Sequence, residues 1–253
     1  KVARRFPQTT FMHASGYKQA RNVGTYQIRA FQGRYLAGVL AGHMSESKQL
    51  GYVAAFPIPE VIRGINAFTL GAQSVDPEIK INVVWLNSWL DTAREREAAD
   101  LLISRGNDVI THHTETPAIM MAAEAAGAWA IGYQYDRSQF APTRHLATIA
   151  HNWMPVYKEV IRAKLAGEWT SSSIWYGVEH SASQLVSVSG AVERPLRDQL
   201  SDMENQIGTG KFRVFSGPIY DTEGQLRVAE GSHLSDAELI SQEWYVAGVN
   251  NTQ

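Results

Sequence analysis

Two adjacent histidines and a nearby glutamate are the residues of this sequence best suited to metal chemistry. They are His112, His113 and Glu115, in the stretch DVITHHTETPAIMM (108–121). Metal-binding helices place two histidines four residues apart on one face, whereas adjacent residues of a strand point to opposite faces. The chain has no cysteine, and no second histidine cluster supplies the missing ligands. The sequence therefore predicts no metal site, and it favours histidines that line the mouth of a binding site.

Sequence motifs of catalysis are equally scarce. The chain contains no G-x-S-x-G elbow, no Walker A loop and no G-x-G-x-x-G fingerprint. Glu60, Asp91, Glu115 and Asp136 are carboxylates that could serve as acid and base. Four such residues on the loops of an α/β sheet are common without catalysis. We therefore expect no catalytic residue and no cofactor.

Composition narrows the class of protein. The chain has 253 residues, of which 44% are hydrophobic, and this suits one or two globular domains. Its formal net charge of −2 gives no reason to expect nucleic acid or an anionic membrane surface as a partner. No apolar run approaches the roughly 18 residues of a membrane span. Arg94 and Arg96 alternate with Glu95 and Glu97, a pattern that predicts a solvated helix face.

Short apolar runs that alternate with helical patterns predict the architecture. We expect strands at 50–56, 81–87, 108–113, 128–135 and 145–152. A helix should begin near Thr92, where Thr92 and Glu95 suit a capping box, and another should have Pro117 at its first position. A further helix should cover residues 155–166. The strands are continuously apolar, as expected when helices cover both faces of a doubly wound parallel sheet.

Ligands of such sheets bind beyond the carboxyl ends of the strands. The segments expected there are 56–60, 87–89, 112–115 and 134–136. They are rich in aromatic rings and in uncharged hydrogen-bonding groups. This mixture suits a flat small molecule with a polar edge, because rings cover its faces while amides or hydroxyls bind its rim.

Several long motifs resemble one family of proteins. They are QGRYLAGVLA (32–41), RGINAFTLGAQSVDP (63–77), WLNSWLD (85–91), GNDVITHHT (106–114) and SGPIYDTEG (216–224). Together they are similar to the basic membrane protein (BMP) family, the substrate-binding proteins of ABC importers, over nearly the whole chain. The resemblance implies a type 1 periplasmic-binding-protein fold, in which two α/β lobes joined by three crossings close on a ligand.

The resemblance also implies a division of the chain. Residues 1–24 and 152–171 would belong to lobe 1, while 25–151 and 172–253 would form lobe 2. Family members begin with strand-helix units that this sequence lacks, so most of lobe 1 is expected to be absent from it. The implied partners are a purine and the membrane permease subunits, with no nucleic acid, and the implied state is a monomer in the periplasm or lipid-anchored at the outer face of the cytoplasmic membrane.

The family relationship and the strand ends together predict a ligand site. Its members are Trp89, Asn87, His113, Thr114, Gln134, Asp136, Trp153 and Phe31. Relatives bind purine nucleosides, and the subgroup with these tryptophan-rich motifs resembles one that takes purine bases, so an adenine-like base is the expected ligand. A nucleoside receptor is the alternative within the family. Outside it, the alternatives are a nucleoside-processing enzyme and a LacI-like regulator.

Overall fold

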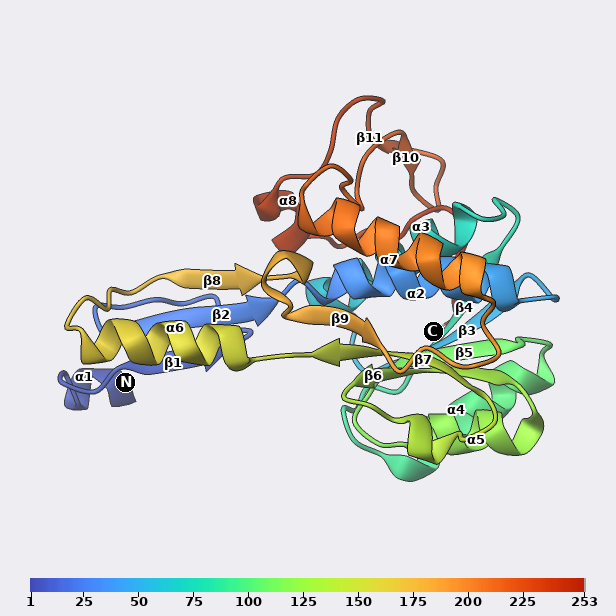
Figure 1. Cartoon of the computed structure of the whole chain (residues 1–253), viewed down its shortest axis with the longest axis horizontal. Helices are drawn as coiled ribbons and strands as arrows, with labels where there is room; N and C mark the ends of the chain where they lie inside the picture. The colour runs from blue at the N-terminus through green and yellow to red at the C-terminus, as the bar shows by residue number, and fades with distance from the viewer. Residues whose placement is uncertain (253) are drawn as a thin grey trace.

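The computed structural model describes residues 1–252 and contains two largely parallel sheets joined by three crossings of the chain (Figure 1). The larger sheet has the strand order β12-β4-β3-β5-β6-β7-β9, and the smaller has the order β1-β2-β8. Neighbouring strands are parallel in both sheets except for β7 and β9, which are antiparallel. The predicted doubly wound parallel sheet is thus confirmed.

The elements have the following bounds. The strands of the larger sheet are β3 (Gln49–Ala54), β4 (Lys80–Trp85), β5 (Val109–His113), β6 (Trp129–Gln134), β7 (His145–His151), β9 (Ser183–Val186) and β12 (Val249–Thr252). The other strands are β1 (Phe11–Ala14), β2 (Val23–Ile28), β8 (Ser173–Tyr176), β10 (Ile219–Tyr220) and β11 (Leu226–Val228). The helices are α1 (Val2–Arg5), α2 (Ala30–Met44), α3 (Pro59–Gln73), α4 (Thr92–Ser104), α5 (Ala118–Ala126), α6 (Met154–Leu165), α7 (Arg194–Gly208) and α8 (Asp236–Ile240), with 3-10 turns η1 (Ser138–Phe140) and η2 (Val178–His180).

Helices cover both faces of the larger sheet. Helices α2 and α3 lie on one face and α4 and α5 on the other (Figure 1). Successive strand residues alternate between the two apolar clusters: Tyr52 packs on the α2 and α3 side, while Val53 and Ile110 pack on the α4 and α5 side. The continuous apolar strands of the sequence are explained by this double burial.

Two glycines allow α2 and α3 to pack backbone against backbone. A Cβ atom on Gly38 would lie 2.1 Å from the carbonyl oxygen of Phe68, and one on Gly71 would lie 2.1 Å from that of Tyr35. Neither contact is possible for a real side chain. The close packing of these helices therefore depends on glycine at both positions.

The smaller sheet carries α6 and is linked to the larger one by three crossings. The chain leaves β2 for α2 at Arg29, leaves β7 for α6 at 152–153, and leaves β8 for η2 at Gly177. Residues 25–28 pair with 173–176 in the smaller sheet, so the sheets divide at 28/29 and 176/177 rather than at the expected 24/25 and 171/172. The strands continue further because their backbone groups find partners in each other. Within residues 1–252 no helix is long and apolar enough to cross a membrane.

Three local predictions around α4 and α5 are wrong in detail. Asp91, not Thr92, caps α4, and its carboxylate accepts a hydrogen bond from the Arg94 N–H. Glu95 is fully buried instead of lying on a solvated face. Pro117 is the N-cap of α5 rather than its first residue.

Candidate ligand-binding site

Seven rings form a continuous series along the carboxyl ends of the strands of the larger sheet and into the smaller sheet. In order they are Phe56, Trp89, His113, Tyr133, His151, Trp153 and Tyr26, and we call this set the aromatic row. Successive ring centroids lie 5.4, 6.0, 4.5, 4.9, 5.9 and 5.4 Å apart. Such separations are typical of interacting aromatic pairs. The row connects the two sheets by direct side-chain contact.

Strand geometry explains why these rings meet. Phe56 and Trp89 lie in the loops after β3 and β4, while His113 and His151 end β5 and β7. Tyr133 is the last residue but one of β6. Because the carboxyl ends of parallel strands meet at the same edge, residues distant in sequence become neighbours there. The predicted mouth of the sheet is therefore the place where the row lies.

Two imidazoles of the row have ring nitrogens without a partner among the described residues. Tyr133 Oη lies 3.1 Å from His113 Nε2. His113 Nδ1 and His151 Nε2 are buried and have no hydrogen-bond partner among residues 1–252. Burial, and after it the charge of Arg34, lowers the pKa of both histidines, that of His151 to about 4. Both rings are thus neutral near pH 7, and each keeps one ring nitrogen for a further partner.

A buried cation lies behind the row. The guanidinium carbon of Arg34 lies 3.8 Å from the Tyr133 ring centroid and 5.1 Å from that of Tyr52. Arg34 Nη1 donates to Thr111 Oγ1 at 3.2 Å, and Nη2 donates to the His112 carbonyl at 2.8 Å. In the described part of the chain no carboxylate forms an ion pair with it within 4.0 Å. The ring of Tyr133 therefore separates a positive charge from the mouth.

Three of the predicted ligand residues belong to the aromatic row: Trp89, His113 and Trp153. Trp89 is 39% exposed, which makes it the most accessible of the three, and His113 is 6% exposed. Trp153 precedes the first residue of α6 and meets Tyr26 of the smaller sheet edge to face. The structure therefore brings these residues, which come from the end of β5 and from the segments after β4 and β7, into one series.

Asn87, Gln134 and Asp136 lie at the strand ends beside the row. Asn87 and Gln134 have φ angles of +52° and +74°, so the chain turns sharply where β4 and β6 end. Gln134 Nε2 donates to Glu115 Oε1 at 2.9 Å, and Asp136 accepts a hydrogen bond from Ser187 Oγ at 2.6 Å. Both side chains already hold neighbouring loops, whereas Asn87 is exposed.

Thr114 and Phe31 are predicted ligand residues that the structure places away from the row. Thr114 is buried, and its hydroxyl donates to Glu95 Oε2 at 2.9 Å on the α4 side of the sheet. Phe31 lies in the first turn of α2 and packs on Trp175 and Phe215, with ring centroids 5.8 and 5.7 Å away. We do not retain either residue in the candidate site, because neither contacts the rings at the strand ends.

The adjacent histidines of β5 point to opposite faces of the sheet, as predicted. His112 Nδ1 lies 3.2 Å from Thr114 Oγ1 on the α4 side, while His113 contacts Tyr133 on the α2 side. The geometry separates the two imidazoles, so they do not share a ligand. Among the residues that the structure describes, no group of three or more His, Cys, Asp or Glu side chains is placed to hold a metal ion.

Sequence reasoning missed Arg34, Tyr133 and His151. The two ring residues lie inside predicted strands and were assigned to the sheet rather than to its mouth. Tyr133 lies two residues before the end of the predicted strand 128–135, and His151 lies one residue before the end of the predicted strand 145–152. Arg34 carried a plainer signal, since it is the only residue with a full charge in the segment AFQGRYLAGVLAG (30–42). A charge in such a position must be paired or functional.

Comparison with known proteins adds three similarities. The family model described as Bmp, ABC transporter substrate-binding protein PnrA-like, matches residues 1–214. A purine-binding protein of Brucella abortus (strain 2308) is 38% identical over 253 residues, which cover 99% of this chain and 71% of that protein. A protein of Haloferax volcanii, whose name assigns it provisionally to glucose binding in an ABC transporter, is 39% identical over 222 residues. That match covers 88% of this chain and 57% of the relative, less than two thirds of its length.

Solved structures show the same fold. An ABC transporter solute-binding protein of Aeropyrum pernix K1 superposes with a TM-score of 0.70 over 86% of this chain and 73% of that chain. The two sequences are 15% identical, so this similarity concerns the architecture alone. The expected type 1 periplasmic-binding-protein fold is therefore confirmed.

Proposed function

The chain belongs to the Bmp family of ABC transporter substrate-binding proteins, and from this premise we propose that it is the receptor of an importer for a purine base. The base would bind at the aromatic row. The receptor changes nothing in its ligand and passes it to permease subunits in the membrane. It would act as a monomer, in the periplasm or lipid-anchored at the outer face of the cytoplasmic membrane.

The aromatic row is the observation that carries this proposal. A purine has two flat faces and an edge of hydrogen-bond donors and acceptors. Rings such as Trp89 stack on the faces, and base-aromatic stacking contributes about 1–3 kcal/mol per base in nucleic-acid binders. The unpartnered nitrogens of His113 and His151 are suited to the edge, because a neutral imidazole either donates or accepts.

The charge of the site supports an uncharged ligand. Both imidazoles of the row are neutral near pH 7, as their lowered pKa values require. The nearest buried cation, Arg34, is covered by the ring of Tyr133 and uses two nitrogens to bind β5. An amino acid or other carboxylate would require an accessible guanidinium at the mouth. A purine base is uncharged near neutral pH and needs no guanidinium at the mouth.

A sugar is the second candidate, because one relative of similar identity is named for glucose binding. Sugar sites also stack rings on their ligand, but they need carboxylates or amides to accept bonds from several hydroxyls. Here Glu115 is bound by Gln134, and Asp136 is bound by Ser187. Over residues 1–252, the buried polar groups of the row without a partner are two ring nitrogens, which suit the donors and acceptors of a base edge better than several sugar hydroxyls, so we favour the purine. A purine nucleoside remains the alternative within the family, because another relative, a protein of Lactococcus lactis, is named for nucleoside binding.

Calorimetric titration of the protein with adenine, hypoxanthine, adenosine and glucose tests the proposal. We expect saturable binding of at least one free base, with quenching of tryptophan fluorescence, and weaker or no binding of glucose. Tighter binding of glucose than of every purine would refute the assignment of the ligand. Chromatography after incubation with adenosine should detect no released base, and steady release would show an enzyme instead of a receptor.

A further inference from the structure

A cavity of about 550 Å³ lies beside the crossings and outside the aromatic row. Its walls come from the start of α2, the end of α7, the loop before β10 and the segment that begins α8. None of the seven rings of the row lines it. Its volume lies within the range of small-molecule sites.

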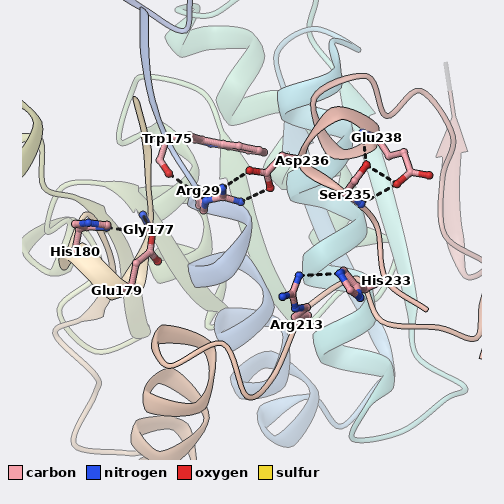
Figure 2. Close-up of polar contacts among 10 residues, drawn as sticks. All are labelled: Arg29, Trp175, Gly177, Glu179, His180, Arg213, His233, Ser235, Asp236 and Glu238. Atoms are coloured by element: carbon pink, nitrogen blue, oxygen red, sulfur yellow. Dashed lines mark hydrogen bonds and ion pairs between the residues drawn. The ribbon is translucent and has the colours of Figure 1, made fainter. Parts of the chain in front are cut away.

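Arg29, at the start of α2, binds the wall of the cavity to the end of β8. The Arg29 N–H donates to the Tyr176 carbonyl at 2.7 Å, and Arg29 Nε donates to the Trp175 carbonyl at 3.1 Å. The two terminal nitrogens of Arg29 bind both carboxylate oxygens of Asp236, at 2.8 and 2.6 Å (Figure 2). Asp236 is thereby neutralised by Arg29 and does not contribute a free negative charge to the cavity.

The other acidic residue that lines the cavity is also occupied. Glu179 Oε1 accepts a hydrogen bond from the Gly177 N–H at 3.0 Å and lies 3.2 Å from His180 Nδ1 (Figure 2). This carboxylate closes its own turn at the third crossing. Both acids lining the cavity therefore have partners within the protein.

Arg213 is the cation of the cavity that lacks an acidic partner. Its Nη1 donates to His233 Nε2 at 2.7 Å (Figure 2). Over residues 1–252, no carboxylate oxygen lies within 4.0 Å of this guanidinium. A guanidinium has five N–H donors in a planar fork, so several remain for a carboxylate or phosphate. The fork is held in place by the histidine.

An apolar surface lies next to this charge. Phe31, Phe212 and Phe215 line the cavity, together with Ile207 and Leu239. Phe31 and Phe215 contact each other with ring centroids 5.7 Å apart. A ligand that satisfies both parts of the cavity must combine an anionic group with a flat or compact apolar body.

We propose that this cavity binds a small organic anion, a carboxylate or phosphate monoester on an apolar body. Arg213 binds the anionic group, and the phenylalanine rings cover the body. The proposal does not depend on what the aromatic row binds, because the two sites share no residue.

Phenyl phosphate, benzoate and the neutral benzyl alcohol are suitable probes, titrated into the protein and followed by NMR or calorimetry. We expect saturable binding of at least one of the two anions, and weaker or no binding of the alcohol. Arg213→Gln should weaken anion binding by roughly ten- to hundredfold, the effect of losing one hydrogen bond to a charged group. Arg213→Lys should retain part of the affinity because it keeps the charge.

Lys211→Gln is the matched control, since it removes the same charge two positions away, outside the cavity lining. Equal weakening by Arg213→Gln and Lys211→Gln would show general electrostatic attraction and overturn the proposal. The absence of saturable binding for both anions would overturn it as well. Competition by a purine that binds the row would place the anion in the row rather than in this cavity.

Discussion

Replacing Trp89 by alanine removes the ring near the outer end of the aromatic row. Trp89 is 39% exposed and contacts Phe56 and His113, with ring centroids 5.4 and 6.0 Å away. The side chain is therefore accessible to a ligand while its orientation is held by two neighbours. Because it lies in a loop at the surface, its removal should cost little folding stability.

The expected loss of affinity follows from the stacking energy. Base-aromatic stacking contributes about 1–3 kcal/mol, and about 1.4 kcal/mol corresponds to a tenfold change in Kd. Trp89→Ala should therefore weaken purine binding by roughly tenfold to a hundredfold. The lower value applies if the exposed ring covers only part of the base.

Calorimetric titration of wild type and variant with the same purine measures this loss. The matched control is Trp129→Ala, which removes the same side chain at the amino end of β6, where Arg144 lies 5.1 Å from its ring centroid. The control should lower the melting temperature but leave Kd unchanged. An unchanged Kd in Trp89→Ala would remove this residue from the site, and equal weakening in both variants would attribute the loss to general destabilisation.

Three further predictions concern packing, hydrogen bonding and pH. Gly38→Ala should lower the free energy of unfolding by about 1–3 kcal/mol, the usual cost of overpacking. Gly190→Ala should leave this free energy nearly unchanged, because there is open space around Gly190. Denaturant titration of both variants measures the difference. Thr114→Val should lower the free energy of unfolding by about 1–3 kcal/mol, because it removes a hydrogen-bond donor from the buried carboxylate of Glu95. The Kd for the purine should stay unchanged, and a clearly higher Kd would return this residue to the site. The pKa of His151 is about 4 in the folded protein against an ordinary 6.5, so the unfolded chain takes up a proton in that window while the folded chain does not. The contribution of His151 to stability should accordingly be fully present above about pH 6.5, fall between about 6.5 and 4 and be lost below, and a His151→Gln variant with the same pH profile as wild type would contradict this origin.

The five central strands of the larger sheet, β3 to β7, were predictable because they are apolar runs between recognisable helices, whereas the edge strands β9 and β12 are short and partly polar and were not predicted. The predicted strands at 50–56 and 145–152 differ from β3 and β7 by one or two residues at their ends. The smaller sheet was harder to delimit. Its strands β2 and β8 are bordered by crossings rather than by turn residues, so the position at which the chain changes sheets depends on pairing that no local pattern shows.

Residues of the candidate site were predictable where they end or follow a strand, and they were missed where they lie inside a helix or strand. Trp89 and His113 were selected because they end or follow strands. Arg34 was missed because a charged residue ordinarily faces solvent, and only the tertiary structure supplies the Tyr133 ring that covers it. Glu95 was misassigned for a similar reason, since its alternating charged neighbours concealed hydroxyl donors that come from another loop.

The last strand of the larger sheet has a consequence for biosynthesis. Strand β12 covers the outer side of β4, and the paired residues Asn82 and Asn250 are separated by 168 positions. At about 5–20 residues per second, a ribosome needs roughly 8–34 s to add that length of chain. During this interval β4 has one side without a partner strand, and such an edge can pair with other nascent chains. Chains that end before residue 249 should therefore be more prone to aggregate than chains that include β12.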